Sequence, residues 1–330
     1  MKLLRTILLI THIMVLFLLL GIFMNAYVPP KIFPWFNLLS LGFPVLMILY
    51  LFLSVFWVAS WKKRAIVFIL VGMIFLNPVK RWINYNSDPK ENFDIKIVSL
   101  NVKAGSKGIS HIEEYINSLD ADIVLLQEYS RKEFQFEKLN NTKSDAINAI
   151  FTRYKIIDQK ELIKSDFETN NAYASQTDIE IKGKTYRFIN VYLQPFKFEK
   201  SMVRLNSSNE ENEQKLKDVV KRLIPTFKKH QEQVKAVRKG IDSSPYPVIL
   251  AGDLNSVPNS YEYYQLSEGL KDAFVEVGKG SATSFHDYKF PLRIDYIFAS
   301  ESIQPVSYKV DRSVGLSDHY PVIATFKIKN

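Results

Sequence analysis

Polar and ionisable residues stand at or just past one end of five short apolar runs in the last roughly 240 residues of the chain. They are Asn101, Glu128, Asp253, Asn255, Asp295, Asp318 and His319. Carboxylate and amide oxygens are the ligands that a hard divalent cation prefers, and an imidazole exchanges protons near neutral pH. A cation and hydrogen-bond donors together stabilise charge that develops on a phosphate. The pattern therefore indicates a metal-dependent phosphoesterase.

The first two runs each end on a polar side chain. Asn101 ends the run 97–101, and Glu128 ends the run 123–128. Mg²⁺ is often held by only one or two carboxylates, with water and substrate phosphate completing its ligands. Glu128 is therefore the best single candidate for a carboxylate ligand. Taken alone, each residue also fits the simpler interpretation of a polar group that ends a strand.

The run 248–256 carries two short polar side chains beside a glycine. Gly252 allows the backbone to turn tightly, so Asp253 and Asn255 are predicted to face one pocket from positions i and i+2. The structural alternative is an Asx-turn, in which the aspartate side chain accepts a backbone hydrogen bond and closes the strand.

Asp295 lies within the otherwise apolar run 293–298, where an unpaired charge would be costly. It needs a partner, and the natural one is His319, which precedes the last strand of the chain. A carboxylate fixes the tautomer of an imidazole and raises its basicity. A buried aspartate together with an Asp-His pair is a more specific signal than any one of these residues.

These side chains must be positioned by alternating strands and helices. Apolar, β-branched runs predict strands, and helical spacing or a long charged stretch with few breakers predicts helices. Apolar strands flanked by helices indicate α/β architecture, with sheets that are covered on their faces. The predicted strands are 95–102, 122–126, 186–193, 248–251, 294–298 and 322–328, and the predicted helices are 109–119 and 209–239.

The motifs together resemble the endonuclease/exonuclease/phosphatase superfamily, which includes pancreatic deoxyribonuclease, exonuclease III, neutral sphingomyelinases and inositol polyphosphate 5-phosphatases. The matching motifs, in family order, are 99–102, 126–128, 252–255, 293–298 and 317–319, and 149–154 resembles a further family strand. The resemblance covers residues 94–329. It implies a four-layer α/β sandwich of the deoxyribonuclease I-like type.

The resemblance also implies roles for individual residues. Glu128 would bind a catalytic Mg²⁺ or Mn²⁺ ion, assisted by Asn101 and Asp318. Asp253 and Asn255 would position the attacking water and the phosphoryl oxygens.

His319, paired with Asp295, would act as general acid or base, or stabilise the pentavalent transition state. The chain departs from part of the family at Tyr192, where sphingomyelinase-like and deoxyribonuclease-like members usually have histidine. The exonuclease III branch has tyrosine there. A phenol can donate a hydrogen bond to phosphate, but its pKa near 10 makes it a poor proton shuttle. Tyr192 therefore weakly favours the nuclease branch.

The N-terminal residues 1–83 are predicted to form a membrane anchor. Residues 6–24 are nearly all apolar, and a helix needs about 20 such residues to cross the hydrocarbon layer. Further spans are predicted at 36–60 and 65–79. A cleaved signal peptide is the alternative for the first span, because Lys2 and Arg5 precede it.

Charged residues between the spans predict the orientation of this multi-pass anchor. Five basic residues fall on the side of the N-terminus and three on the other, which places the N-terminus in the cytoplasm. After a linker at 84–93, the catalytic domain at 94–330 then lies on the extracytoplasmic side.

Charge and histidine placement limit the remaining functions. The part before residue 94 carries +7 of the formal net charge of +9, so global charge is no evidence for a nucleic-acid ligand. The substrate alternatives are a nucleic acid and a phospholipid headgroup, and an inactive, membrane-tethered binding module is the alternative from another class. No protein partner is implied. His111 and His230 lie in polar helical stretches and are expected to be solvated.

Overall fold

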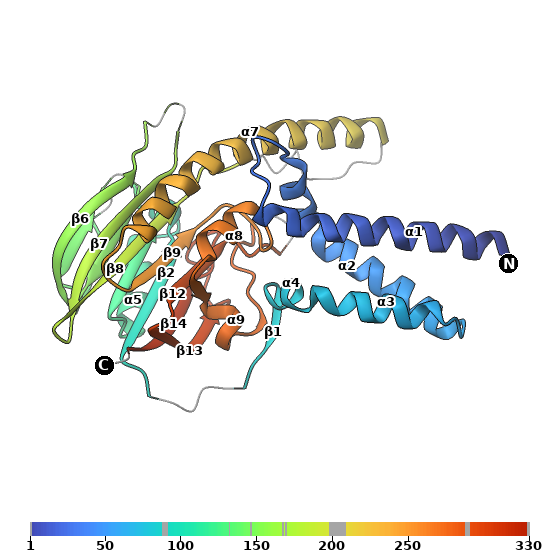
Figure 1. Cartoon of the computed structure of the whole chain (residues 1–330). Coiled ribbons are helices and arrows are strands. Elements are labelled where there is room, and N and C mark those ends of the chain that lie inside the picture. The colour runs from blue at the N-terminus through green and yellow to red at the C-terminus, as the bar shows by residue number, and fades with distance from the viewer. Residues whose placement is uncertain are drawn as a thin grey trace.

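The computed structural model describes residues 2–87, 92–131, 133–145, 147–166, 168, 170–197, 209–287 and 291–328. Residues 88–91 of the predicted linker and the last two residues of the predicted catalytic domain therefore lie outside the described residues. Figure 1 shows an N-terminal group of helices that extends from one end of a sandwich of strands and helices.

The N-terminal helices form an up-down bundle. Its elements are α1 (Lys2–Gly21), the 3₁₀ turn η1 (Ile22–Ala26), α2 (Trp35–Ala59), α3 (Arg64–Gly72), η2 (Met73–Phe75) and α4 (Leu76–Lys80). Among the described residues, two helical stretches are long and apolar enough to cross a membrane, Lys2–Ala26 and Trp35–Ala59. They overlap the first two predicted spans. The third predicted span, 65–79, is divided among α3, η2 and α4 and stays a prediction.

The bundle is apolar on its inner and its outer faces. Leu19, Phe43 and Trp57 are buried where the helices pack together. Phe17 and Phe52, by contrast, are 69% and 70% exposed on the outside of the bundle. A helix that is apolar all round is typical of a membrane span or of the core of a large protein.

The rest of the chain builds two facing sheets, each of six strands within the described residues. In spatial order, the first sheet contains β13 (Ile303–Val310), β14 (Val322–Ile328), β2 (Ile95–Asn101), β3 (Ile123–Gln127), β5 (Ala149–Thr152) and β4 (Asn141–Ser144). The second contains β10 (Leu270–Asp272), β12 (Asp295–Ser300), β9 (Val248–Asp253), β8 (Lys184–Tyr192), β7 (Tyr173–Ile181) and β6 (Lys155–Ile163).

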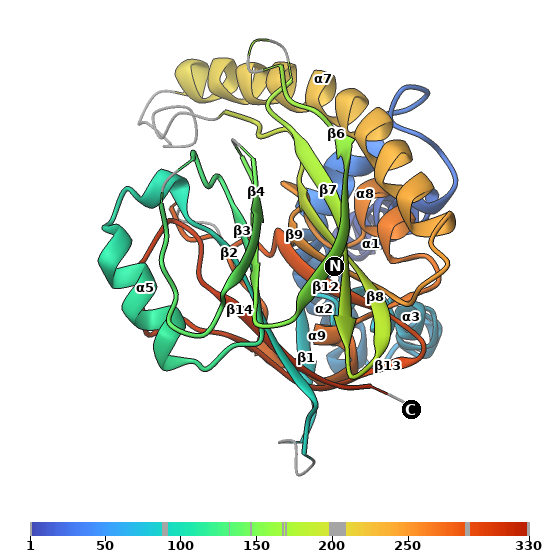
Figure 2. The same cartoon turned by 90° about the vertical axis from the view of Figure 1, so that its left-hand side faces the viewer.

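Helices cover the outer faces of both sheets, so the sandwich has four layers (Figure 2). The central core joins the inner faces through residues such as Ile97 of β2 and Phe188 of β8. Helix α5 (Ile109–Ser118) buries Ile112 against the first sheet. Helices α7 (Asn209–Asp242) and α8 (Tyr261–Ser267) pack on the second. The predicted α/β sandwich is confirmed.

Strand directions bring the ends of strands from both sheets to one edge. Strands β2 and β3 run parallel, with Asn101 opposite Gln127. Strands β8 and β9 also run parallel, with Tyr192 opposite Asp253. Strand β12 runs antiparallel to β9 and begins with Asp295 opposite Asp253. Polar residues from distant parts of the sequence therefore meet at this edge.

The start of the predicted linker belongs to the fold. Strand β1 (Ile83–Tyr85) pairs with β11 (Lys279–Ser281). The buried Asn84 donates hydrogen bonds to the carbonyl oxygens of Phe274 and Val275 in α9 (Ala273–Val277). The bundle is thus tied to the sandwich directly after α4.

Candidate active site

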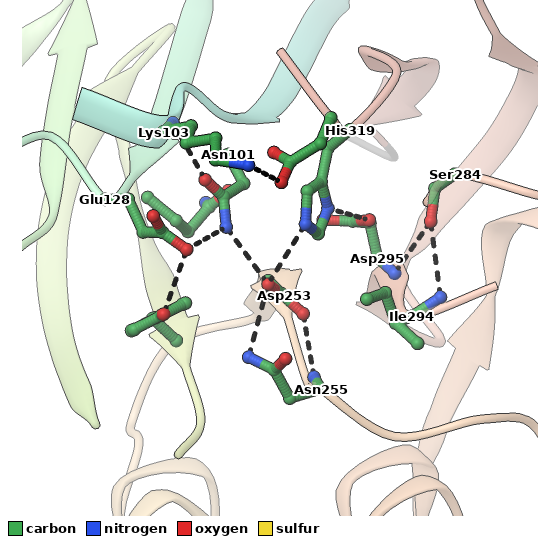
Figure 3. A network of polar contacts seen from close by, with 12 residues as sticks. Asn101, Lys103, Glu128, Asp253, Asn255, Ser284, Ile294, Asp295 and His319 are labelled. Carbon is green, nitrogen blue, oxygen red and sulfur yellow. Dashed lines mark hydrogen bonds and ion pairs between the residues drawn. The ribbon is translucent and has the colours of Figure 1, made fainter. Parts of the chain in front are cut away.

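The structure brings all the predicted site residues together at the shared edge of the two sheets. Figure 3 shows Asn101, Glu128, Asp253 and His319 facing one another from different strands and loops. The remaining four predicted residues, Tyr192, Asn255, Asp295 and Asp318, each contact this group or line the same cavity.

Glu128 is held by two neutral donors. The Asn101 amide donates to Glu128 Oε1 over 2.9 Å, and the Tyr192 hydroxyl donates to the same oxygen over 2.9 Å. Burial, followed by the charge of Glu128, raises the pKa of Tyr192 well above its usual value. Tyr192 therefore stays protonated, and its hydroxyl orients the Glu128 side chain.

Asp253 is the buried centre of the site. Its Oδ2 accepts a hydrogen bond from Asn101 over 3.1 Å and lies 3.8 Å from Nε2 of His319. Its Oδ1 accepts from the Asn255 backbone N–H over 2.7 Å. Asp253 therefore does both things that the sequence suggested: its Oδ1 closes an Asx-turn, and its Oδ2 faces the site. Burial, reinforced by Asp295, raises the pKa of Asp253 to about 8 against the opposing effect of His319.

His319 is fixed from its other ring nitrogen. Its Nδ1 lies 2.8 Å from Oδ2 of Asp295, which is the pairing predicted from the sequence. The Ser284 hydroxyl oxygen accepts the backbone N–H groups of Asp295 and Ile294, which fixes the start of β12. Burial lowers the pKa of His319, but the charges of Asp295 and Asp253 outweigh it and raise the pKa to about 10. The imidazole is therefore set up to hold a proton at neutral pH.

Glycine at position 252 is required by the backbone. Gly252 has φ 141°, and a Cβ atom there would lie 2.0 Å from the carbonyl oxygen of Val191 in the neighbouring strand. Asn255 and Glu128 also have positive φ values, 43° and 50°. Such backbone conformations are uncommon for residues other than glycine and cluster at functional sites.

Lys103 is a site residue that the sequence did not reveal. Its ammonium group forms an ion pair with Asp318 and lies 3.8 Å from a carboxylate oxygen of Asp287. It follows Asn101 by two residues, in the short turn η3 (Lys103–Gly105). Lysines are common in turns, so neither its type nor its position singled it out.

The prediction for His230 is wrong, because this side chain is fully buried. Its Nδ1 lies 2.7 Å from Oε1 of Glu262, and its Nε2 lies 2.7 Å from the carbonyl oxygen of Gln194. The polar composition of α7 concealed that one face of the helix is covered. His111 is exposed, as predicted.

The donor set fits a hard divalent cation. Glu128 and Asp318 line one cavity, together with Asp253 and Asp287, so acidic groups gather beside the amide of Asn101. Oxygen ligands of this kind suit Mg²⁺ or Mn²⁺.

A second group with metal-binding potential lies beside this set. One ligand atom from each of Asp253, Asp295 and His319 lies within 4.8 Å of the others. In that group, however, the ring nitrogen nearest Asp295 already pairs with it over 2.8 Å. The group is therefore better suited to proton transfer than to holding the ion.

The cavity has a volume of about 320 Å³ and joins two kinds of surface. Its polar end is lined by Lys103, Glu128, Asp253, Asn255, Asp318 and His319. Its other end is lined mainly by apolar side chains from α2, α7 and the loops after β8 and β9. A volume near 300 Å³ is typical of a small-molecule site.

The fold and this edge of the sandwich define a hydrolase that acts on phosphate esters. The chain belongs to the endonuclease/exonuclease/phosphatase family, whose sequence model matches residues 98–319. A second model, for a domain of unknown function (DUF8431), matches residues 5–82, which include the helical bundle. No curated protein matches the chain.

Several solved structures share the fold. A mannosyl-6-phosphatase from Bacteroides thetaiotaomicron VPI-5482 is 18% identical, with 70% of this chain and 99% of that chain covered and a TM-score of 0.51. The human Nocturnin catalytic domain with bound sulfate anion is 14% identical, with 74% and 96% covered and a TM-score of 0.51. Humanized D. rerio TDP2 is 17% identical, with 71% and 98% covered and a TM-score of 0.50. At these identities the likeness shows the fold alone.

Proposed function

We propose that the protein is a membrane-anchored, divalent-metal-dependent phosphoesterase that hydrolyses a phosphodiester or phosphomonoester by in-line attack of water. The observation that carries this proposal is the convergence of Glu128, Asn101 and Asp253 with the His319–Asp295 pair at one end of a cavity.

Glu128, Asn101 and Asp318 are the residues that would hold Mg²⁺ or Mn²⁺. When bound, the ion would neutralise charge on the phosphate oxygens. Tyr192 supports this set by donating its hydroxyl hydrogen bond to Glu128.

The remaining residues handle water, phosphate and protons. Asp253 accepts a hydrogen bond from the attacking water and positions it. The Asn255 amide donates to the Leu193 carbonyl oxygen and to Asp253, which fixes its side chain beside the position of the phosphate. His319 donates a proton from Nε2 toward the leaving oxygen, while Asp295 stabilises the charged ring through Nδ1.

The bundle supports membrane anchoring because its outer surface is apolar. Large side chains including Phe17, Val45, Phe52 and Ile66 are more than half exposed on it. Exposed apolar area of this extent is typical of contact with a membrane or a partner. The length of the two long helices, and the basic residues confined to the ends of the bundle, favour the membrane.

The first prediction tests the chemistry with the full chain and both p-nitrophenyl phosphate and bis-p-nitrophenyl phosphate. Chelation of divalent ions is expected to abolish release of p-nitrophenol, and added Mg²⁺ or Mn²⁺ to restore it. His319→Ala is expected to lower kcat by at least about a hundredfold because the proton donor is lost. Glu128→Gln is expected to raise the Mg²⁺ concentration for half-maximal rate by at least about tenfold.

Matched controls separate these effects from damage to the fold. His111→Ala and Glu137→Gln alter exposed residues that do not line the cavity and are expected to keep the parental rate. Absence of divalent-dependent turnover of both esters, or unchanged turnover in His319→Ala, would contradict the proposal and favour the binding module.

The nuclease alternative rests on Tyr192, which resembles the exonuclease III branch. Among the described residues that line the cavity, Lys103 and Lys197 supply the basic side chains, while Glu128, Asp253, Asp287 and Asp318 are acidic. Nucleic-acid grooves are strongly basic and carry stacked aromatic platforms. The charge of the cavity lining therefore gives this alternative no added support.

A further inference from the structure

The apolar end of the cavity is continuous with the end that carries the phosphate chemistry. Phe285 packs on His319 and Ile294 adjoins Asp295, and the other apolar lining residues form this end: Leu41, Pro195, Phe196, Leu223, Phe227, Val257 and Leu292. A substrate with only polar groups would leave this wall in contact with water. A hydrocarbon group would cover it and gain free energy from the burial.

The wall on one side comes from the membrane anchor. Asn37 and Leu41 of α2 both line the cavity and are four residues apart, so they lie on one face of the helix. Asn37 donates to both carboxylate oxygens of the buried Glu262, over 3.1 and 2.9 Å, and accepts the Tyr261 backbone N–H over 2.7 Å. Helix α2 is thereby fixed against the start of α8.

A second polar contact fixes the same end of α2. Ser40 donates to the carbonyl oxygen of Asn259 over 2.7 Å, and Asn25 of η1 donates to that oxygen over 2.9 Å. Asn259 lies in the loop that follows β9 and its Asp253. The position of Leu41 is therefore coupled to the loop that carries Asp253 and Asn255.

Helix α7 and the loop after β8 form the facing wall. Leu223 and Phe227 are buried and four residues apart on α7, and both line the cavity. The ring of Phe196 packs at 81° to that of Phe227, with 5.5 Å between ring centroids. This wall is apolar at Phe196, Leu223 and Phe227, and Lys197, the next residue in the loop after β8, adds a basic side chain to the cavity lining.

The α2 wall continues outward along the surface of the bundle. Val45, Ile48, Phe52 and Val55 follow Leu41 at steps of four, three, four and three residues, so they lie in one stripe along α2. Each of these four side chains is more than half exposed. An apolar path therefore leads from the face proposed to contact the bilayer to the catalytic end of the cavity.

We infer that the apolar end is a subsite for the hydrocarbon chain of an amphiphilic phosphate ester, which enters from the bilayer along α2 and presents its phosphate to Glu128 and His319. This inference rests on the proposed phosphoesterase function and adds a substrate class and a specificity-determining residue, Leu41. The anchor then contributes part of the substrate site as well as a tether.

The test uses the full chain in lipid nanodiscs and two p-nitrophenyl phosphodiesters that differ in their second group, methyl or octyl. The parent is expected to show a kcat/KM for the octyl ester at least about tenfold above that for the methyl ester, since burial of two methylene groups already changes an equilibrium by about that factor. Leu41→Trp fills the subsite and is expected to reduce this ratio toward one.

The matched control is Leu49→Trp, which places the same bulky group on α2. Leu49 is 40% exposed and does not line the cavity. It lies about 80° around the helix from Leu41. This variant partitions into the bilayer as Leu41→Trp does, and it is expected to keep the parental octyl-to-methyl ratio.

Binding gives a readout that does not depend on turnover. With Mg²⁺ present, octylphosphonate is expected to bind the parent at least about tenfold more tightly than methylphosphonate, and Leu41→Trp to remove the difference. Equal turnover and equal binding of the short and long compounds in the parent would overturn the subsite. So would a parental preference that Leu41→Trp and Leu49→Trp leave equally unchanged, because bilayer partitioning alone would then explain it. Loss of turnover with retained chain-length-dependent binding would overturn the phosphoesterase function and leave the subsite standing.

Discussion

At the residue scale, the site depends on one buried pair whose two members need each other. Asp295 is almost fully buried at the start of β12, where a lone carboxylate would be costly. His319 supplies its partner, and Asp295 in turn keeps the imidazole charged. The pair therefore stabilises its own strand end and stores a proton beside Asp253.

The pair predicts a pH dependence. Because the carboxylates raise the pKa of His319 to about 10, the proton donor is present below that pH, and the rate is expected to fall as pH rises through it. Asp295→Asn removes the nearest charge, so the pKa of His319 falls and the alkaline limb of kcat/KM moves to lower pH by about one to three units. A pH profile of bis-p-nitrophenyl phosphate hydrolysis measures this shift.

The control for this prediction is Asp311→Asn. Asp311 is also buried, but its carboxylate contacts Tyr115 and Ser313 rather than His319. The alkaline limb is expected to stay where it is in the parent. An unmoved limb in Asp295→Asn would show that His319 does not supply the titrating proton.

The sequence predicted site residues best where a polar side chain interrupts an apolar run. Asp295 and Asp253 stand out because burial of a carboxylate in such a run needs a reason. Lys103 and Ser284 were missed because each lies among residues that are ordinary in loops. His230 was assigned wrongly because its burial depends on Glu262 and Gln194, which are distant in sequence.

At the element scale, the close approach of β8 and β9 sets the position of Asp253. Gly252 faces the Val191 carbonyl oxygen so closely that no side chain fits between the two strands. This contact places Tyr192 opposite Asp253. The sequence predicted only a tight turn at Gly252. The close contact with β8 was not predicted, because a sequence does not show which strand lies beside another.

Gly252→Ala tests this packing. Its φ of 141° is strained for alanine, and the added Cβ would meet the Val191 carbonyl oxygen at 2.0 Å. We expect the free energy of unfolding to fall by at least about 2 kcal/mol, measured by thermal or denaturant unfolding of the full chain. Gly315→Ala is the control, since a methyl group at Gly315 would meet no heavy atom within 4 Å and the residue has no positive φ. Equal stability of the two variants would contradict the proposed constraint.

Strands with apolar runs were predicted, and strands without them were missed. The strands β2, β9 and β14 match predicted ranges to within a few residues. The strands β6 and β7 were not predicted. Most of β6 is not buried, and β7 buries polar residues that the sequence pattern alone would place in water. Asp178 of β7, for example, is neutralised by Arg187 of β8 through bonds of 2.7 and 2.8 Å.

At the scale of the whole molecule, the bundle and the sandwich share a polar interface close to the candidate active site. Arg81 donates to the side chain of Asn259, and its carbonyl oxygen accepts a hydrogen bond from Arg293. Arg293 is itself buried and paired with Asp272. The sequence did not predict these contacts, because its composition changes sharply near residue 90 and suggests two separate parts. In the structure, the N-terminal bundle and the sandwich are joined by hydrogen bonds.

The arrangement of the bundle predicts an orientation for the proposed membrane anchor. Figure 1 shows the N-terminus at the end of the bundle remote from the sandwich. The sandwich follows directly on α4 and β1 at the other end. Basic residues are more numerous at the remote end, which favours that end in the cytoplasm. The sandwich would then face the extracytoplasmic side.

This orientation can be measured by labelling single cysteines, because the chain has no cysteine of its own. Glu114→Cys places a thiol on the exposed face of α5, and Lys63→Cys places one in the turn before α3. In spheroplasts, a membrane-impermeant maleimide is expected to label Glu114→Cys at once and Lys63→Cys only after lysis. The parent chain controls for background labelling. The reverse labelling pattern would place the sandwich in the cytoplasm, where intracellular phosphate esters would reach the cavity. Labelling of both cysteines before lysis would mean that the bundle does not cross the bilayer as proposed.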